Sequence, residues 1–366
     1  GMQPQLAISY NSGGGNGWLG LGWDLSVPSI SVETRWGSPR YDAGLETETY
    51  LLNGEMLTPV AHRGALQNRT AEKIFHTRVE GGFRKIVRHG NAPANYWWEV
   101  TDKNGMKNFY GGSGTSQDAG AIHGSGTGVY KWMLRQTVDS NGNIVVYEYG
   151  HVCDTGIGSG VCGSAGFVDG TQLYLSKVRY TAHTSDSKAP YTVEFVRDSA
   201  RAGYKRDYNA AGYDSTMDRR KDVQIDSRGG YKQVTAERLK YIIVKFNDAT
   251  VRSYELDYRE GAFGKSLLSA VVQKDANGVE FNRHAMDYYN EVPVGANAGH
   301  AQGPVGDLPP LSQLRTSDGD LPGVPPPLRA PRGLLAVAAH AAHRRVRDHR
   351  DLEQRGRPGV PRHGDR

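Results

Sequence analysis

Residues 9–31, SYNSGGGNGWLGLGWDLSVPSIS, constrain the fold of this chain more than any other segment, because large apolar residues alternate there with glycines. A flexible glycine–serine linker has no need for two tryptophans, whose burial is worth roughly 1.5 to 3 kcal/mol each. We therefore expect packed backbone, in which glycine allows close approach. The residues expected to determine this structure are Gly13, Gly14, Gly15, Gly17, Trp18, Gly20, Gly22 and Trp23.

The same segment contains the pattern G-x-G-x-x-G at Gly15, Gly17 and Gly20. In dinucleotide-binding folds this pattern opens a helix whose N-terminus holds a pyrophosphate. Here the third glycine is followed by another glycine, a tryptophan, β-forming residues and Pro28, without helical periodicity. The sequence instead favours a strand over residues 6–10, a glycine-rich turn, and a second strand over residues 29–34.

From residue 6 to residue 289, short runs rich in Tyr, Val, Ile, Trp and Thr are separated by Gly, Asn, Asp and Pro. This pattern predicts an all-β fold of antiparallel hairpins and meanders. Strict alternation places Tyr254, Leu256 and Tyr258 on one strand face, with polar residues between them. We predict paired strands over residues 96–110, 129–149, 239–258 and 267–289.

Three predicted turns share the sequence motif D-x-N-G, and each is expected to connect the two strands of a hairpin. Asn and Gly tolerate the positive φ of tight turns, and the Asp side chain can accept backbone N–H groups across the bend. None continues with the further oxygen ligands of a calcium loop. The turn residues are Asp102, Asn104 and Gly105, then Asp139, Asn141 and Gly142, then Asp275, Asn277 and Gly278.

The two cysteines flank a glycine-rich loop, CDTGIGSGVC, from Cys153 to Cys162. A disulfide between them would close the loop with a gain of roughly 2.5 to 3 kcal/mol. The alternative is two free thiols in a mobile loop. The redox conditions of the compartment decide between the two states, and the spacing of the cysteines does not indicate the compartment.

The formal charge of +5 does not indicate a nucleic-acid partner, because it is concentrated at the end of the chain. Residues 291–366 hold 11 arginines against 8 acids, so only +2 remains on the first 290 residues. The longest apolar run, residues 334–339, is far shorter than the roughly 20 residues that a membrane span needs. We expect neither nucleic-acid binding nor direct membrane insertion.

Composition changes abruptly near residue 290. The last 76 residues contain no Phe, Trp, Tyr or Lys, and 11 of the 17 prolines. Such a segment cannot build a comparable core. We therefore divide the chain into a β domain over residues 1–290 and a Pro/Arg/Ala-rich tail over residues 291–366, which is disordered or the product of a frameshift near residue 300.

Candidate catalytic groups are few. Glu46 and Glu48 form an E-x-E pair. The alternation of side chains along a strand places both on its solvent-exposed face, so we expect solvated carboxylates. Glu99 and Asp102 follow Trp97 and Trp98 and could serve as the acid and base of a glycosidase, but nothing in the sequence fixes their separation. Trp98 is better explained as part of a buried strand face. The histidines are scattered, so no catalytic metal and no cofactor are predicted.

A family resemblance emerges from the opening segment PQLAISYNSGGGNGWLGLGWDLSVPSISVET, followed by GSPRYD and TYLLNGEMLTP. These residues resemble the start of the Salmonella virulence plasmid protein B family and of the B component of insecticidal toxin complexes. Later segments, including DSNGNIVVYEY and RSYELDYREGAFGKSLLSAVVQKDANGVEF, are similar to that family and to the related rearrangement-hotspot, or YD-repeat, shells. The resemblance spans roughly residues 3 to 290.

The resemblance implies a structural role for a secreted protein. In that family, β-strands form part of a curved shell that holds a toxic polypeptide, and toxin-complex or YD-repeat proteins are the partners. ADP-ribosylation belongs to a separate C-terminal domain, and the chain looks like a fragment of a longer protein. An extracellular glycan-binding or adhesin module that uses Trp97 or Trp98, and a glycosidase that uses Glu99, are the alternatives.

Overall fold

The computed structural model describes residues 2–59, 64–186 and 188–288, and nearly all of their regular structure is β-strand. The 3-10 turns are η1 (Ala119–Ala121), η2 (Asp198–Ala200) and η3 (Ala262–Gly264). All strand pairings are antiparallel except a single parallel bridge between β15 and β18. The predicted all-β class is confirmed, whereas the tail predicted over residues 291–366 lies outside the described residues.

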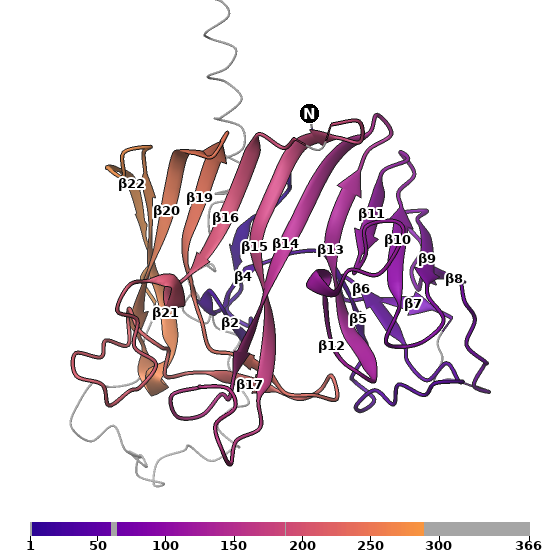
Figure 1. Cartoon of the computed structure of the whole chain (residues 1–366), viewed down its shortest axis with the longest axis horizontal. Coiled ribbons are helices and arrows are strands. Elements are labelled where there is room, and N and C mark those ends of the chain that lie inside the picture. Colours follow the sequence, from indigo (N-terminus) through magenta and orange to yellow (C-terminus); the bar gives the residue numbers. More distant parts are fainter. Residues whose placement is uncertain (1, 60–63, 187, 289–366) are drawn as a thin grey trace, which may run out of the picture.

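One part of the sheet closes into a ring (Figure 1, on the right). Each strand of the ring pairs with the next, and β13 closes the ring because it pairs with β11 along one edge and with β5 along the other. The strands are β5 (Ser29–Val32), β6 (Tyr50–Leu52), β7 (Glu55–Thr58), β8 (Lys73–Thr77), β9 (Lys85–His89), β10 (Trp97–Thr101), β11 (Lys107–Tyr110) and β13 (Gly128–Val138).

The long strand β13 also begins a curved antiparallel sheet that extends away from the ring. This sheet runs in the order β13-β14-β15-β16-β19-β20-β21-β22. Its further strands are β14 (Asn143–Asp154), β15 (Gly170–His183), β16 (Tyr191–Arg197), β19 (Leu239–Phe246), β20 (Ala249–Glu260), β21 (Ser266–Lys274) and β22 (Glu280–Ala285). The short strands β12 (Ile122–Ser125), β17 (Gln224–Asp226) and β18 (Gln233–Thr235) line its margins.

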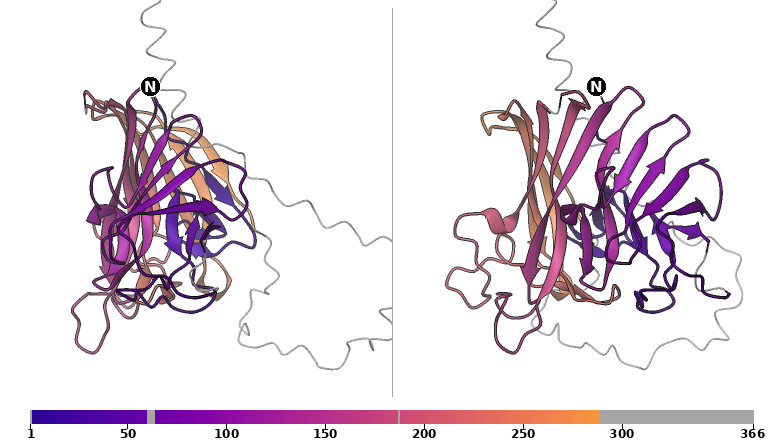
Figure 2. Two further views of the ribbon diagram at one scale, coloured as in Figure 1. Left: turned by 90° about the vertical axis from the view of Figure 1, so that its right-hand side faces the viewer. Right: turned by 45° about the vertical axis from the view of Figure 1, so that its right-hand side comes forward.

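The N-terminal segment lies inside the curve of this sheet, as the two rotated views in Figure 2 show. It forms two small two-stranded sheets. One pairs β1 (Ile8–Tyr10) with β4 (Trp23–Leu25), and the other pairs β2 (Asn16–Gly17) with β3 (Gly20–Leu21). The predicted single turn between two strands was therefore wrong: the glycine block itself contains three short strands, because tertiary contacts hold each bend.

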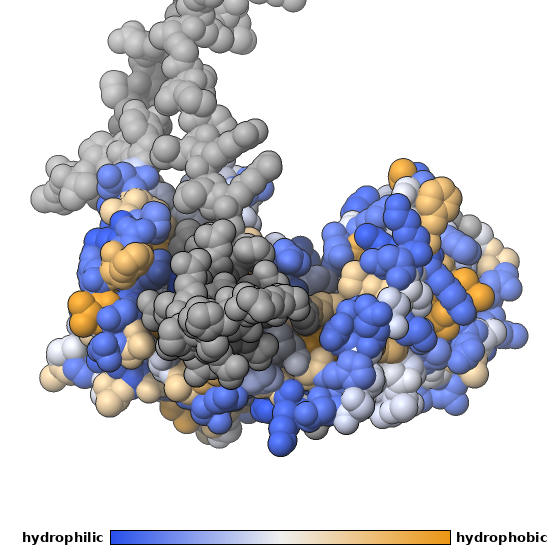
Figure 3. Space-filling model, turned by 90° about the horizontal axis from the view of Figure 1, so that it is seen from above, coloured by the Kyte–Doolittle hydropathy of each residue, from blue (hydrophilic) through white to orange (hydrophobic). Residues whose placement is uncertain are grey.

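Alternation places the core on the inner face of the curved sheet. Tyr254, Leu256 and Tyr258 are buried, as predicted, whereas Glu255 and Asp257 on the other face form ion pairs with lysines of neighbouring strands. The four predicted strand pairs correspond to β10–β11, β13–β14, β19–β20 and β21–β22. Seen from above (Figure 3), the visible surface is mainly hydrophilic and is hollowed between the two ends of the molecule.

Candidate functional site

The glycine-rich segment is anchored to the inner face of the sheet by its apolar side chains. Leu19 and Trp23 are buried, and half-buried Trp18 packs on Tyr174 with ring centroids 5.4 Å apart. The indole Nε1 of Trp23 donates to the hydroxyl of Tyr288 at 2.7 Å, and this hydroxyl donates to the Leu268 carbonyl of β21 at 2.6 Å. The segment is thus fixed to the strands near the end of the sheet.

Three glycines of the segment stand where a side chain would collide with backbone or a ring. Gly20 has a φ of +86°, and a Cβ there would lie 2.5 Å from the Ser266 carbonyl oxygen. Gly22, with a φ of +79°, would place a Cβ 2.6 Å from the Tyr10 ring, and Gly14 would place one 2.8 Å from the Asn11 carbonyl oxygen. At these positions the backbone requires glycine.

The other three glycines of the predicted set have room for a side chain. A Cβ at Gly15 meets nothing within 4 Å, and those at Gly13 and Gly17 meet their nearest atoms at 3.6 and 3.8 Å, which is ordinary contact. None of the three is among the glycines with positive φ. The block therefore combines positions fixed by close approach with positions that any small residue could occupy.

A buried ion pair holds the backbone of the glycine segment. Arg220 donates to the Gly17 carbonyl at 2.6 Å and to the Asn16 side-chain oxygen at 2.5 Å. Its Nε also donates to Asp222 at 2.8 Å, and Asp222 accepts from the Asn16 amide and the Ser266 backbone N–H, both at 2.7 Å. Burial acts to raise the pKa of Asp222, but the hydrogen bonds and charge of Arg220, with these donors, lower it on balance.

The connection between β16 and β17, which carries Arg220 and Asp222, also contributes one partner to each of two further buried ion pairs. Arg219 donates to both carboxylate oxygens of Asp154, at 2.8 Å to Oδ1, and both residues are buried. Arg238 donates from Nε to Asp198 at 3.0 Å, and this pair is buried as well. Sequence reasoning missed Arg219, Arg220 and Asp222, because the run MDRRKD over residues 217–222 resembles a solvated charged turn.

The prediction that Glu46 and Glu48 are solvated was wrong. Both are buried inside the ring of strands. Glu46 binds the Arg88 guanidinium through both of its oxygens, at 2.5 and 2.8 Å, and Glu48 binds Arg69 at 2.6 Å. The guanidinium of Arg88 also lies 3.9 Å from the centre of the Tyr96 ring. The glutamates can be buried because the fold brings two arginines, distant in sequence, to neutralise their charges.

Two open grooves border the glycine segment, with volumes of about 630 and 780 Å³. The first lies between the segment and strands β13 and β15, and the second between the segment and the β17–β18 hairpin. Asp24, Gln172 and Thr235 line both grooves. Gln172 donates from Nε2 to the hydroxyl of Thr235 at 2.5 Å, so two of these three side chains are bonded to each other.

The D-x-N-G residues lie at the ends of the β10–β11, β13–β14 and β21–β22 hairpins. Gly105, Gly142 and Gly278 all have φ near +80°. Asp139 accepts the N–H groups of Asn141 and Asn143, and Asp275 accepts those of Asn277 and Val279. The side chain of Asp102 differs, because it accepts from Arg84 and from the Asn108 amide.

The aromatic and acidic residues considered for glycan chemistry occupy structural positions. Trp98 is buried with Tyr96 and Val100, as predicted, and Trp97 is buried on the opposite face of β10. Glu99 is ion-paired with Lys107 at 3.1 Å.

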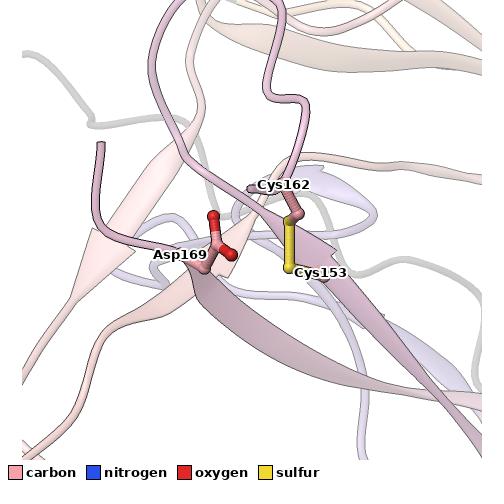
Figure 4. Close-up of side chains that lie close together, drawn as sticks. All are labelled: Cys153, Cys162 and Asp169. Atoms are coloured by element: carbon pink, nitrogen blue, oxygen red, sulfur yellow. A yellow bond between two sulfur atoms is a disulfide. The ribbon is translucent and has the colours of Figure 1, made fainter. Parts of the chain in front are cut away.

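A disulfide joins Cys153 and Cys162, with their Cα atoms 6.2 Å apart (Figure 4).

Within the described residues, no helix has the length and apolar character needed to cross a membrane.

Solved structures share this fold. The N-terminal domain of the effector protein SpvB from Salmonella typhimurium superposes with a TM-score of 0.58 and 22% identity, covering 78% of this chain and 95% of that domain. The TcdB2–TccC3 structure superposes with a TM-score of 0.60 and 22% sequence identity. The Photorhabdus luminescens Tc holotoxin pore superposes with a TM-score of 0.56 and 21% sequence identity. Each covers 78% of this chain and 15% of the other. The chain therefore shares its all-β fold with these structures.

The family model of the Salmonella virulence plasmid 65kDa B protein matches residues 1–207, and the chain belongs to this family. The predicted resemblance is thereby confirmed. The mono(ADP-ribosyl)transferases SpvB of Salmonella typhimurium and Salmonella choleraesuis are each 27% identical over 197 residues. This match covers 49% of the chain and 32% of each relative, so the chain corresponds to about a third of their length.

Proposed function

We propose that this chain is a non-enzymatic structural module of a secreted toxin-complex B-like protein, forming part of the wall of a β-shell that encloses a toxin polypeptide. Its partners are then toxin-complex or YD-repeat proteins and the enclosed toxin. The observation that carries the proposal is the open edge of the curved sheet at β22. The fold shared with TcdB2–TccC3 supports it.

Apolar side chains of the N-terminal segment fill the centre of the curved sheet, and this limits what the module can contribute to a shell. Leu6, Ile8, Leu19 and Trp23 of the N-terminal segment belong to the same hydrophobic cluster as the inner face of the sheet. A cargo chain therefore cannot occupy the centre of this domain. The domain acts as a solid section of wall, and the enclosed space is formed only with further strands.

The outer face of the sheet suits contact with water. Lys177 and Lys245 on β15 and β19 both pair with Glu194 on the strand between them, at 3.2 and 2.7 Å. Farther along, Lys240 and Lys274 pair with Glu255 on β20, at 3.0 and 2.6 Å. Alternating charges across strands keep this face solvated and oppose sheet stacking.

The edge strand β22 is the place where the wall can continue. It pairs with β21, and no strand of the described part pairs with its other edge. Its residues are mostly exposed, and Phe281 is the extra residue of a bulge between the pairs 273–282 and 274–280. An unpaired edge of this kind is a template for an added strand.

Blocking this edge tests the proposal. The N–H of Met286 donates to the Ser269 carbonyl at 2.9 Å, so alternation along the ladder directs the N–H of Ala285 away from β21. Ala285→Pro removes that donor, and proline is tolerated on a strand edge that faces outward. Ala285→Thr keeps the N–H and is the matched control.

The readout is complex formation with a YD-repeat partner of the toxin-complex type, followed by size-exclusion chromatography with light scattering. We expect wild type and Ala285→Thr to form the complex, and Ala285→Pro to lose it while keeping the melting temperature of the free chain. Equal complex formation by all three would exclude the β22 edge as the point of continuation, and no complex with wild type would contradict the proposed function.

A further inference from the structure

Three side chains with metal-binding atoms meet at the neck of the loop between β14 and β15 (Figure 4). Cys153 lies on β14, Cys162 lies in the loop, and Asp169 directly precedes β15. Their two sulfur atoms and a carboxylate oxygen all lie within 4.8 Å of one another. Cys153 and Asp169 are exposed and Cys162 is half-buried, so reductants and ions can reach the group.

The carboxylate of Asp169 is positioned beside the sulfurs without a competing cation. Both of its oxygens accept the Gly163 N–H at 3.1 Å, which ties Asp169 to the residue that follows Cys162. In the described part of the chain, the arginine ion pairs near this loop go from Arg206 and Arg219 to Asp154, and none goes to Asp169. Its remaining lone pairs are therefore available to a metal ion.

A lysine supplies positive charge to the same loop. The ammonium of Lys232 donates to the carbonyl oxygens of Thr155 and Val168, at 2.6 and 2.8 Å. These residues lie near Cys153 and Asp169 in the chain. Lys232 therefore joins the two sides of the loop neck.

We propose that Cys153, Cys162 and Asp169 form a zinc site when the disulfide is reduced, so that the loop neck is closed by either a covalent bond or a metal ion. A dithiol reductant supplies two electrons and two protons, the S–S bond becomes two thiols, and the reductant forms its own disulfide. Zinc then displaces the two thiol protons and binds two thiolates and one carboxylate oxygen, with water as the fourth ligand.

The geometry fits zinc. Zn–S bonds of about 2.3 Å and Zn–O bonds of about 2.1 Å in a tetrahedral site place ligand atoms roughly 3.6 to 3.8 Å apart. The three ligand atoms start within 4.8 Å of one another, and after reduction the two bonded sulfur atoms have to move apart to reach the zinc separation. Thiolate ligands also favour zinc over hard cations such as calcium.

The experiment uses the full chain, reduced with a dithiol and freed of reductant under anaerobic conditions. Zinc is titrated by calorimetry in two buffers of different protonation enthalpy, so that proton release is measured with binding. We expect the reduced chain to bind one more zinc ion than the Cys153→Ser/Cys162→Ser variant, with release of about two protons. The oxidised chain should lack this additional site, and calcium should not occupy it.

Asp169 is tested separately. Asp169→Asn should weaken zinc binding at least tenfold, whereas Asp169→Cys should restore or strengthen it. Cobalt(II) gives an independent readout, since its spectrum in the reduced wild type should show thiolate coordination that the double-serine variant lacks. If the reduced chain binds no more zinc than the double-serine variant, or if Asp169→Asn binds as tightly as wild type, the proposed site is wrong.

Discussion

Replacing Gly20 by alanine tests whether the glycine segment is locked against the sheet as described. The backbone φ of +86° costs an alanine about 1 to 2 kcal/mol. The added methyl group would also lie 2.5 Å from the Ser266 carbonyl oxygen, and overpacking of this kind costs about 1 to 3 kcal/mol. We expect Gly20→Ala to lower the free energy of unfolding by about 2 to 5 kcal/mol.

Gly15→Ala is the matched control five residues earlier in the same block. A methyl group at Gly15 meets no atom within 4 Å, and its φ is not positive, so stability should stay within about 0.5 kcal/mol or rise slightly through loss of unfolded-state entropy. The assay is urea denaturation followed by the fluorescence of the six tryptophans, which include Trp18 and Trp23 of the segment. Equal midpoints for Gly20→Ala and Gly15→Ala would refute the close approach to β21.

Three further predictions concern the buried polar groups and the disulfide. Because the folded-state pKa of Asp222 is lowered, its full contribution to stability is present above the unfolded value of about 3.9 and is lost as the pH falls from there through the folded-state pKa. Asp222→Asn should flatten this acid dependence in denaturation curves measured from pH 7 down to about pH 2. Arg88→Met should destabilise by about 3 kcal/mol because it removes the bidentate partner of buried Glu46, which keeps only the longer ion pairs with Arg69 at 3.5 Å and Lys73 at 3.7 Å. The Glu46→Leu/Arg88→Met double variant should lose less than the sum of the single changes in a double-mutant cycle. Cys153→Ser/Cys162→Ser should lower stability under oxidising conditions by roughly 2.5 to 3 kcal/mol, and this difference should vanish when both proteins are compared in metal-free reductant.

The strands of the curved sheet were predictable because their signal is local. Tyr254, Leu256 and Tyr258 alternate with polar residues, and a period of two fixes which face is buried. The D-x-N-G turns likewise encode their own geometry, since Gly142 and Gly278 adopt the positive φ that such turns require.

The buried charges were not predictable, since their compensation is nonlocal. Glu46 is separated from Arg88 by 42 residues, and Asn16 from Asp222 by 206. Alternation alone assigns such acids to the solvent face. Only the closed ring and the return of the chain to the N-terminal segment supply the arginine and the amide donors that make burial favourable.

The glycine segment was identified correctly as packed backbone, but its internal structure was not. Gly20 needs to be glycine because of Ser266, a residue of β21 that no local pattern associates with it. The sequence signal therefore reported that close contacts exist, and the fold was needed to show which of the glycines make them.

Protection of a cargo polypeptide from protease tests the proposed role in a toxin shell most directly. The chain is assembled with a YD-repeat partner and its cargo, and the cleavage rate of the cargo is compared with that of the free cargo. We expect wild type and Ala285→Thr assemblies to slow cleavage strongly, and the Ala285→Pro sample to leave the cargo as sensitive as the free polypeptide. Cleavage of the cargo in the wild-type assembly at the rate of free cargo would contradict the account.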